Sequence, residues 1–176
     1  ARMQEIAEEA NVNVSLLYYY YQSKQNLFEA VFNQAFCLFS RAMNGIFSSD
    51  SSIETKIREF TDSYSSLLSR HPYLANFIIQ EIRRSPDYIG NLKTNPKFPN
   101  FKKLNTQLVE EIRKGNIIPI SGEQLFINII SLNVLPFMTG PLFEGYLNYD
   151  HGSFNKLMEV RKTEVADFII NSIKRK

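Results

Sequence analysis

Four tyrosines follow one another at residues 18–21, in a chain that contains nine tyrosines in all. The flanking pattern predicts a short helix, in which each residue is rotated by about 100° from the one before. Leu17 and Tyr21 then lie about 40° apart and are expected to face the core as a pair. Tyr18, Tyr19 and Tyr20 face outward. They either cover apolar surface of the next helix, or donate hydrogen bonds from their hydroxyl groups to phosphate oxygens while the rings pack on sugars.

The other side chains that often carry chemistry are scattered along the chain. His71 and His151 each stand beside loop residues, so we expect them to cap helices or face solvent. Neither histidine belongs to a cluster of cysteines and carboxylates with zinc-ligand spacing. Cys37 lies in an apolar run, has no second cysteine to pair with, and is expected to pack as a small hydrophobe in a reducing compartment. The sequence therefore predicts no catalytic site, no metal site and no cofactor, and the protein is not expected to be an enzyme.

Composition restricts the class of protein further. The chain has 176 residues, of which 44% are apolar, so it can bury a core as one compact domain or as a small module attached to a larger one. No apolar run approaches the roughly 20 residues needed to span a bilayer. The opening ARMQEIAEEA is an amphipathic helix pattern and not a signal peptide. We therefore expect a cytoplasmic protein that has no membrane partner.

Charge at the N-terminal end argues against a generic nucleic-acid patch. The net charge of the whole chain is +2. Residues 1–34 contain two basic and four acidic side chains, a local balance of 2 − 4 = −2, namely Arg2 and Lys24 against Glu5, Glu8, Glu9 and Glu29. If this end binds DNA, it does so through a specific pattern of side chains and not through a basic surface.

Helical periodicity covers nearly the whole chain, which predicts an all-α fold. A first helix, residues 3–10, has an apolar face made of Met3, Ile6, Ala7 and Ala10. Asn11 can take the left-handed conformation that ends this helix, and Asn13 can cap the next one, residues 14–21. Ser23 can cap a long third helix, residues 24–47, whose expected buried face is Leu27, Val31, Ala35, Leu38 and Ala42.

The remaining elements are also predicted from caps and apolar spacing. Ser51 and Glu54 have capping-box spacing, and Pro72 suits the first turn of a helix that runs to about residue 84. Residues 87–99 have a loop-like composition, and a further helix follows from 101 until Gly115. Ser121 opens a helix to residue 138 that is apolar nearly all round, so we expect it to be buried on all sides, one of them against another subunit. Gly140 and Pro141 are expected to end that helix, and a last helix covers residues 154–173.

The stretch IAEEANVNVSLLYYYYQSKQNLFEAV resembles the DNA-binding signature of the TetR family of bacterial repressors. That signature reads roughly I-A-x-x-A-G-V-S-x-x-x-L-Y-x-x-F-x-x-K-x-x-L. It is matched at the correct spacing by eight residues, Ile6, Ala7, Ala10, Val12, Leu17, Tyr18, Lys24 and Leu27. Asn11, Asn13 and Tyr21 depart from it conservatively. Asn accepts the conformation of Gly and caps as Ser does, and Tyr keeps the ring.

The resemblance implies a fold and a domain division. A helix-turn-helix DNA-binding domain is expected over residues 1–34, and an all-helical effector-binding and dimerisation domain over residues 35–176. Family members carry another helix before this motif, so we expect a segment before residue 1 to complete the DNA-binding domain.

The resemblance also implies DNA contacts. Bases are read from the N-terminal end of the second helix, at Asn13, Val14, Ser15 and Leu16. Phosphates are bound at the positions of Tyr18 and Lys24, while Tyr19 and Tyr20 touch the backbone or groove. Arg2 is a further candidate for a phosphate contact. Because Val14 and Leu16 offer only apolar contacts, we expect modest direct readout and a larger share from phosphate contacts and DNA shape.

The C-terminal residues suggest an interface and a pocket. The candidate dimer interface comprises Ile127, Ile130, Val134, Met158, Val165, Phe168 and Ile169. An apolar or aromatic effector could be bound by Phe39, Met43, Phe60, Tyr64, Phe77, Gln80, Phe101, Leu108, Phe126 and Ile130, although the same residues could simply form a core.

Two functions remain open at this point. The first is a dimeric repressor whose binding to double-stranded operator DNA is controlled by a small-molecule effector. The second is a helical small-molecule-binding or scaffold protein whose N-terminal module no longer binds DNA. The acidic balance of residues 1–34 and the apolar Val14 and Leu16 keep this second possibility open.

Overall fold

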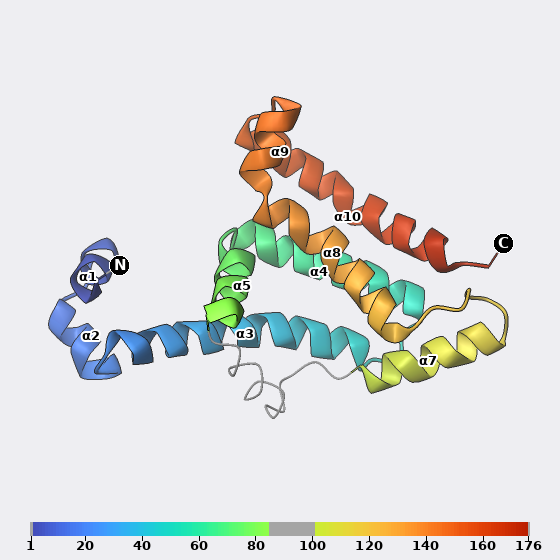
Figure 1. Cartoon of the computed structure of the whole chain (residues 1–176), viewed down its shortest axis with the longest axis horizontal. Helices are drawn as coiled ribbons and strands as arrows, with labels where there is room; N and C mark the ends of the chain where they lie inside the picture. The colour runs from blue at the N-terminus through green and yellow to red at the C-terminus, as the bar shows by residue number, and fades with distance from the viewer. Residues whose placement is uncertain (1, 85–100, 176) are drawn as a thin grey trace. The chain divides into compact units, whose positions relative to one another are not determined.

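The computed structural model describes residues 2–84 and 101–175, without the side chains of residues 39, 42 and 84. These residues form an all-α fold (Figure 1). Its helices are α1 (Met3–Glu9), α2 (Val14–Tyr21), α3 (Lys24–Phe47), α4 (Ile53–Arg70), α5 (Leu74–Arg84), α7 (Lys102–Arg113), α8 (Gly122–Met138), α9 (Gly140–Leu147) and α10 (His151–Ile173). The chain divides within α3 into two compact units, residues 1–38 and 39–176.

In the first unit, α1 packs against α2 across a short turn. Asn11 adopts a left-handed conformation, with φ of 53°, and ends α1 as the sequence predicts. The Oδ1 of Asn13 accepts a hydrogen bond of 2.8 Å from the main-chain N–H of Ser15, which confirms the predicted N-cap of α2. The predicted apolar face of α1 is only partly correct. Met3 and Ala7 are buried, but Ala10 is exposed because α1 ends at Glu9 and turns away.

The long helix α3 begins at Lys24, where the Oγ of Ser23 accepts a hydrogen bond of 3.1 Å from the N–H of Asn26. This confirms the cap predicted at Ser23. The predicted buried face is wrong at Val31 and Leu38, which are both exposed. The larger rings of α3, at Phe32, Phe36 and Phe47, are buried. Apolar spacing alone did not distinguish these faces, because α3 carries apolar residues around much of its circumference.

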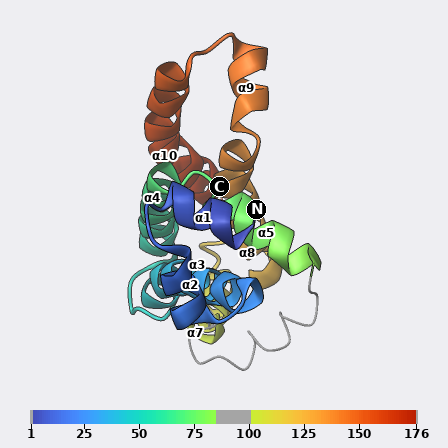
Figure 2. The ribbon, with the colours of Figure 1, turned by 90° about the vertical axis from the view of Figure 1, so that its left-hand side faces the viewer.

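The second unit is built around α4, α8 and α10. Helix α10 packs along α4, and α8 packs against both (Figures 1 and 2). Helix α7 packs against α4 and α8. Their facing residues form one hydrophobic core, in which Phe60, Leu68, Leu125 and Ile129 are fully buried. An isolated β-bridge between Ile117 and Lys174 ties the end of α10 to the α7–α8 connection.

Several predicted boundaries differ from the structure. Helix α4 is capped by Ser52, whose Oγ accepts from the N–H of Thr55 at 3.1 Å, and not by Ser51. Pro72 lies in the turn before α5 and outside its first turn. The loop expected at 87–99 lies outside the described residues. The Ser121 cap of α8 is confirmed, with a hydrogen bond from the N–H of Gln124.

The region between α8 and α10 contains a helix that the sequence analysis missed. Gly140 and Pro141 end α8 as predicted, yet they also begin α9, because proline fits the first turn of a helix. Helix α10 starts at His151, three residues earlier than expected, and the Oδ1 of Asp150 caps it through the N–H of Ser153. Figure 2 shows α9 beside the first turns of α10.

Candidate nucleic-acid interface

The N-terminal end of α2 is open to solvent. Asn13, Ser15 and Leu16 are exposed, and Val14 is half-buried. The Oδ1 of Asn13 is engaged in the cap, so its amide nitrogen is the group left to donate to another molecule. The four residues expected to read bases thus offer one amide donor, one hydroxyl and two apolar side chains.

Further along α2, the tyrosines divide as helical geometry predicts. Tyr18, Tyr19 and Tyr20 are 50%, 77% and 70% exposed, whereas Leu17 and Tyr21 are half-buried. The rings of Tyr19 and Tyr20 meet edge to face, with centroids 5.2 Å apart. Exposure this large means that the three outward rings cover little of the surface of this unit. These three side chains are therefore accessible to another molecule.

The two basic residues of this unit are both exposed. Lys24 is the first residue of α3, and Arg2 precedes α1, where its main-chain N–H donates to the Oε2 of Glu5 at 2.7 Å. A cation at the N-terminus of a helix opposes the helix dipole, so Lys24 does not stabilise α3. A bound anion at that position would instead interact favourably with both the ammonium group and the dipole.

These features of residues 2–38 agree with the family comparison. Residues 1–31 match the family model described as bacterial regulatory proteins, tetR family. This segment is therefore a helix-turn-helix domain of the TetR type. The match supports a DNA-binding transcriptional regulator of the TetR type. A comparison with curated proteins found no match to the chain.

The residues expected to bind an effector in this TetR regulator lie in the second unit, mostly inside its core. Met43, Phe60, Tyr64 and Leu108 are buried, and burial raises the pKa of the Tyr64 hydroxyl. Others are half-buried, namely Phe77, Phe101, Phe126 and Ile130. Gln80 is exposed, so it does not line the core, and the Phe39 side chain lies outside the described residues.

Phe47, which the sequence analysis did not select, is the centre of this aromatic cluster. Its ring centroid lies 5.3 Å from the rings of both Phe60 and Phe101 and 6.4 Å from that of Phe126. Phe101 and Phe126 are themselves 4.4 Å apart. The sequence does mark Phe47 as the last apolar residue of α3 before a polar linker. Its position in the helical repeat alone, however, does not predict that its ring faces α4.

The predicted dimer residues separate into two groups. Val134, Met158, Val165 and Ile169 are buried inside this chain, so they are not free to contact a partner. Val134, Val165 and Ile169 face the core shared with α4, and Met158 lies between α8, α9 and α10. Ile130 is half-buried against the same core. Of the predicted residues, only Ile127 and Phe168 are exposed. Leu135 on α8 and Val160 on α10, which the sequence analysis did not select, are exposed as well.

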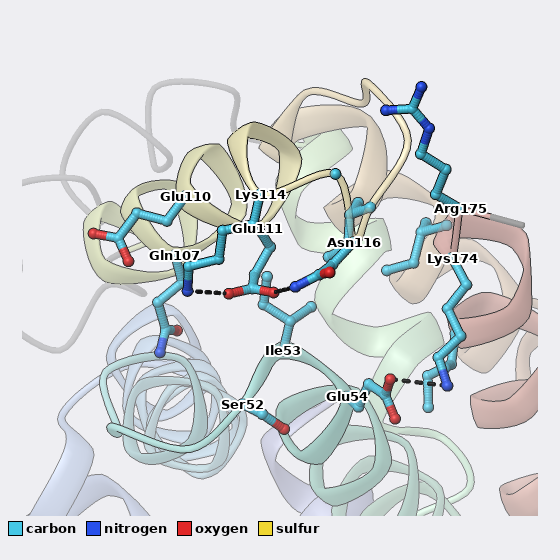
Figure 3. A pocket seen from close by; sticks show the side chains of 14 residues that line it. Ser52, Ile53, Glu54, Gln107, Glu110, Glu111, Lys114, Asn116, Lys174 and Arg175 are labelled. Atoms are coloured by element: carbon cyan, nitrogen blue, oxygen red, sulfur yellow. Dashed lines mark hydrogen bonds and ion pairs between the residues drawn. The ribbon is translucent and has the colours of Figure 1, made fainter.

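The described residues of the second unit line a large pocket and a smaller, more apolar one. The larger, of about 720 Å³, lies where α4 begins and where α7 and α10 end (Figure 3). Two ion pairs lie among its lining residues: Lys174 pairs with Glu54 at 2.9 Å, and Lys114 pairs with Glu111 at 2.8 Å. Hydrogen bonds from the Asn116 amide and from Lys114 also hold the pKa of Glu111 below its usual value. The smaller pocket, of about 310 Å³, is mainly apolar and lies between α8, α9 and α10.

Within residues 2–84 and 101–175 there is no cluster of metal ligands and no single helix suited to span a membrane. No group of three or more His, Cys, Asp and Glu side chains there is arranged to hold a metal ion. Of the helices in these ranges, none is both long and apolar enough to cross a membrane alone, and only the bent pair α8 and α9 passes that test of length and composition together.

Proposed function

We propose that this TetR-type regulator is a dimeric repressor that binds operator DNA through the outward face of α2 and is released or engaged by a small apolar effector. The observation that carries the proposal is the exposure of three consecutive tyrosines, Tyr18 to Tyr20, on the helix that follows the turn. Tyrosine hydroxyls donate to phosphate oxygens without adding positive charge. This accounts for DNA binding by a unit whose formal charge is −2.

The base-reading end of α2 supports limited sequence discrimination by hydrogen bonds. Asn13 and Ser15 are the only two of its four residues that can bond to base edges, while Val14 and Leu16 suit contact with a thymine methyl group. Specificity then depends substantially on how readily a DNA sequence takes the required shape. Among variants of the operator, changes at positions that the protein does not touch should therefore affect affinity.

Fluorescence anisotropy with the DNA that flanks the regulator's own gene tests the proposal. Affinity should fall steeply as salt rises, because phosphate contacts release counterions. Lys24→Ala should lower the slope of log affinity against log salt by about 1. Lys156→Ala, which removes an exposed lysine of the second unit, is the matched control and should leave the slope unchanged. Failure of the full-length protein to bind DNA even at low salt contradicts the proposal.

That negative outcome would favour the second candidate, a helical small-molecule-binding protein that no longer binds DNA. One observation supports this candidate: the exposed carboxylates of Glu5, Glu8 and Glu9 all lie on α1 or beside it and would repel phosphates that came close.

The effector part of the proposal rests on the aromatic cluster around Phe47. The ring centroids of this cluster lie 4.4–6.4 Å apart. If an aromatic ligand displaced one ring, the remaining rings would offer it both faces and edges. An aromatic effector should therefore raise the thermal midpoint of the protein, and Phe126→Leu should reduce that shift. A ligand-bound structure in which the cluster stays closed and only polar molecules bind elsewhere contradicts this assignment.

The dimer part rests on the outer face of α8 and α10. Ile127, Leu135 and Phe168 are each more than half exposed, which is a substantial apolar surface for three residues. Two copies of this face would bury it, as helices of a bundle do. A dimer also suits DNA recognition, since two copies of α2 are needed to reach successive major grooves.

A further inference from the structure

One stripe of α10 has a symmetric arrangement that the proposed dimer can use. Leu157, Arg161, Glu164 and Phe168 are separated by four, three and four residues, so they lie along one side of the helix. The two ends of the stripe are apolar and its two central positions carry opposite charges. The midpoint of the stripe lies between Lys162 and Thr163. The two apolar residues, Leu157 and Phe168, are equally far from this midpoint, and so are the oppositely charged Arg161 and Glu164.

Arg161 is held in place by a main-chain group that a proline has left without a partner. Pro136 lies inside α8 and has no N–H, so it cannot donate to the carbonyl oxygen of Leu132 one turn earlier. The Nη2 of Arg161 donates to that oxygen instead, at 3.2 Å. The guanidinium group is thereby fixed against α8.

The charge of Arg161 is not compensated within the part of the chain that the structure describes. None of the ion pairs found there includes Arg161 or Glu164. The Nε of Arg161 is buried and has no hydrogen-bond partner among these residues. Both side chains line the apolar pocket between α8, α9 and α10, beside Leu135 and Leu157. A guanidinium group in such surroundings is stabilised strongly by a carboxylate, and poorly by one carbonyl alone.

Two-fold symmetry supplies that carboxylate. Two copies of a helix related by a two-fold axis perpendicular to it run antiparallel, and residues at equal distances from the axis face one another. We propose that α10 pairs with its copy about the midpoint of the stripe. Arg161 of each protomer then bonds to the partner's Glu164, and Leu157 packs against the partner's Phe168. This inference rests on the dimer of the proposed function and adds its register and its charge pairs.

Exchanging the charges tests the register. In E164R every facing pair becomes Arg with Arg, and in R161E every facing pair becomes Glu with Glu, so each variant alone should self-associate at least about a hundredfold more weakly. A mixture of the two variants restores an Arg–Glu pair at both positions. Native mass spectrometry of the mixture should therefore show the mixed dimer in large excess over either homodimer. K156E, a reversal of charge elsewhere on α10, should self-associate as the wild type does.

A second readout does not depend on the folding of R161E, which also loses the bond to Leu132. Salt screens charges, so raising salt should strengthen the E164R dimer while it weakens the wild-type dimer. A wild-type dimer that E164R leaves unchanged at every salt concentration overturns the register and leaves the dimer itself standing. Loss of dimers in both single variants without recovery in their mixture also overturns it. A wild-type monomer at the concentrations used for DNA binding overturns both the register and the dimer.

Discussion

The Nζ of Lys56 donates a hydrogen bond to the carbonyl oxygen of Phe47 at 3.1 Å, so that a fully buried ammonium group on α4 closes the last turn of α3. The same ammonium donates to the Oε1 of Gln107, and the Nε2 of Gln107 in turn donates to the carbonyl oxygen of Ser51 at 3.1 Å. This network connects the end of α3, the α3–α4 turn and α7, directly beside the aromatic cluster around Phe47.

Replacing that lysine should destabilise the second unit. Lys56→Met keeps the length and removes the charge, but leaves the Phe47 carbonyl and the Gln107 amide oxygen without this donor. Each unpaired buried acceptor costs about 1–3 kcal/mol. Part of this cost is offset, because the variant no longer has to remove an ammonium group from water. We expect the free energy of unfolding to fall by about 1–3 kcal/mol, measured by urea denaturation.

The same lysine predicts a pH dependence of stability. Burial, with the neighbouring Lys103 charge, lowers the pKa of Lys56 below its ordinary value of 10.5. Between the lowered folded pKa and 10.5 the unfolded chain binds more protons than the folded one, so stability from this group rises with pH in that window. Lys56→Met should lack this rise. Equal slopes of stability against pH in both proteins, just below pH 10.5, contradict the prediction.

The cap of α2 can be separated from DNA binding with two substitutions. Asn13→Ala removes the acceptor for the Ser15 N–H and should cost about 1 kcal/mol of stability. Asn13→Asp keeps an acceptor of equal quality, so the thermal midpoint should be close to that of the wild type. It also places a carboxylate at the proposed DNA surface and should therefore weaken DNA binding. An Asn13→Asp protein that binds DNA as the wild type does would count against the proposed orientation of α2.

The hydrogen bond from Arg161 to the Leu132 carbonyl oxygen should contribute to stability only while Pro136 is present. Pro136→Ala supplies an N–H that can donate to the Leu132 carbonyl within α8. Arg161→Met should therefore destabilise the wild type by about 1 kcal/mol more than it destabilises the Pro136→Ala protein. A double-mutant cycle in chemical denaturation measures this coupling. Additive effects of the two substitutions would show that proline and arginine act independently.

Short-range signals accounted for the parts of the fold that the sequence predicted correctly. The turn between α1 and α2 follows from Asn11 and Asn13, whose side chains favour a left-handed residue and an N-cap wherever they occur. The outward direction of Tyr18 to Tyr20 follows from helical pitch once Leu17 and Tyr21 are assigned inward. The family model then matches the same residues.

The packing of the second unit depends on which helices contact one another, and hydrophobic periodicity in the sequence does not specify these contacts. Val165 and Ile169 are as apolar as any interface residue, yet they face α4 within the chain. Helix α9 was missed because Gly140 and Pro141 end one helix and begin the next. The role of Arg161 depends on a carbonyl oxygen 29 residues away that only the packed structure brings within reach.

The central claim is that the outward tyrosines of α2 bind the DNA backbone through their hydroxyl groups. The most direct measurement compares the operator affinities of Tyr18→Phe and Tyr21→Phe at one fixed salt concentration. Each variant loses one hydroxyl from the same helix, but the Tyr18 side chain is exposed whereas the Tyr21 side chain is half-buried. A hydrogen bond to a charged phosphate predicts about ten- to hundredfold weaker binding for Tyr18→Phe and little change for Tyr21→Phe. Wild-type affinity in the Tyr18→Phe protein, or a greater loss in Tyr21→Phe, contradicts the account.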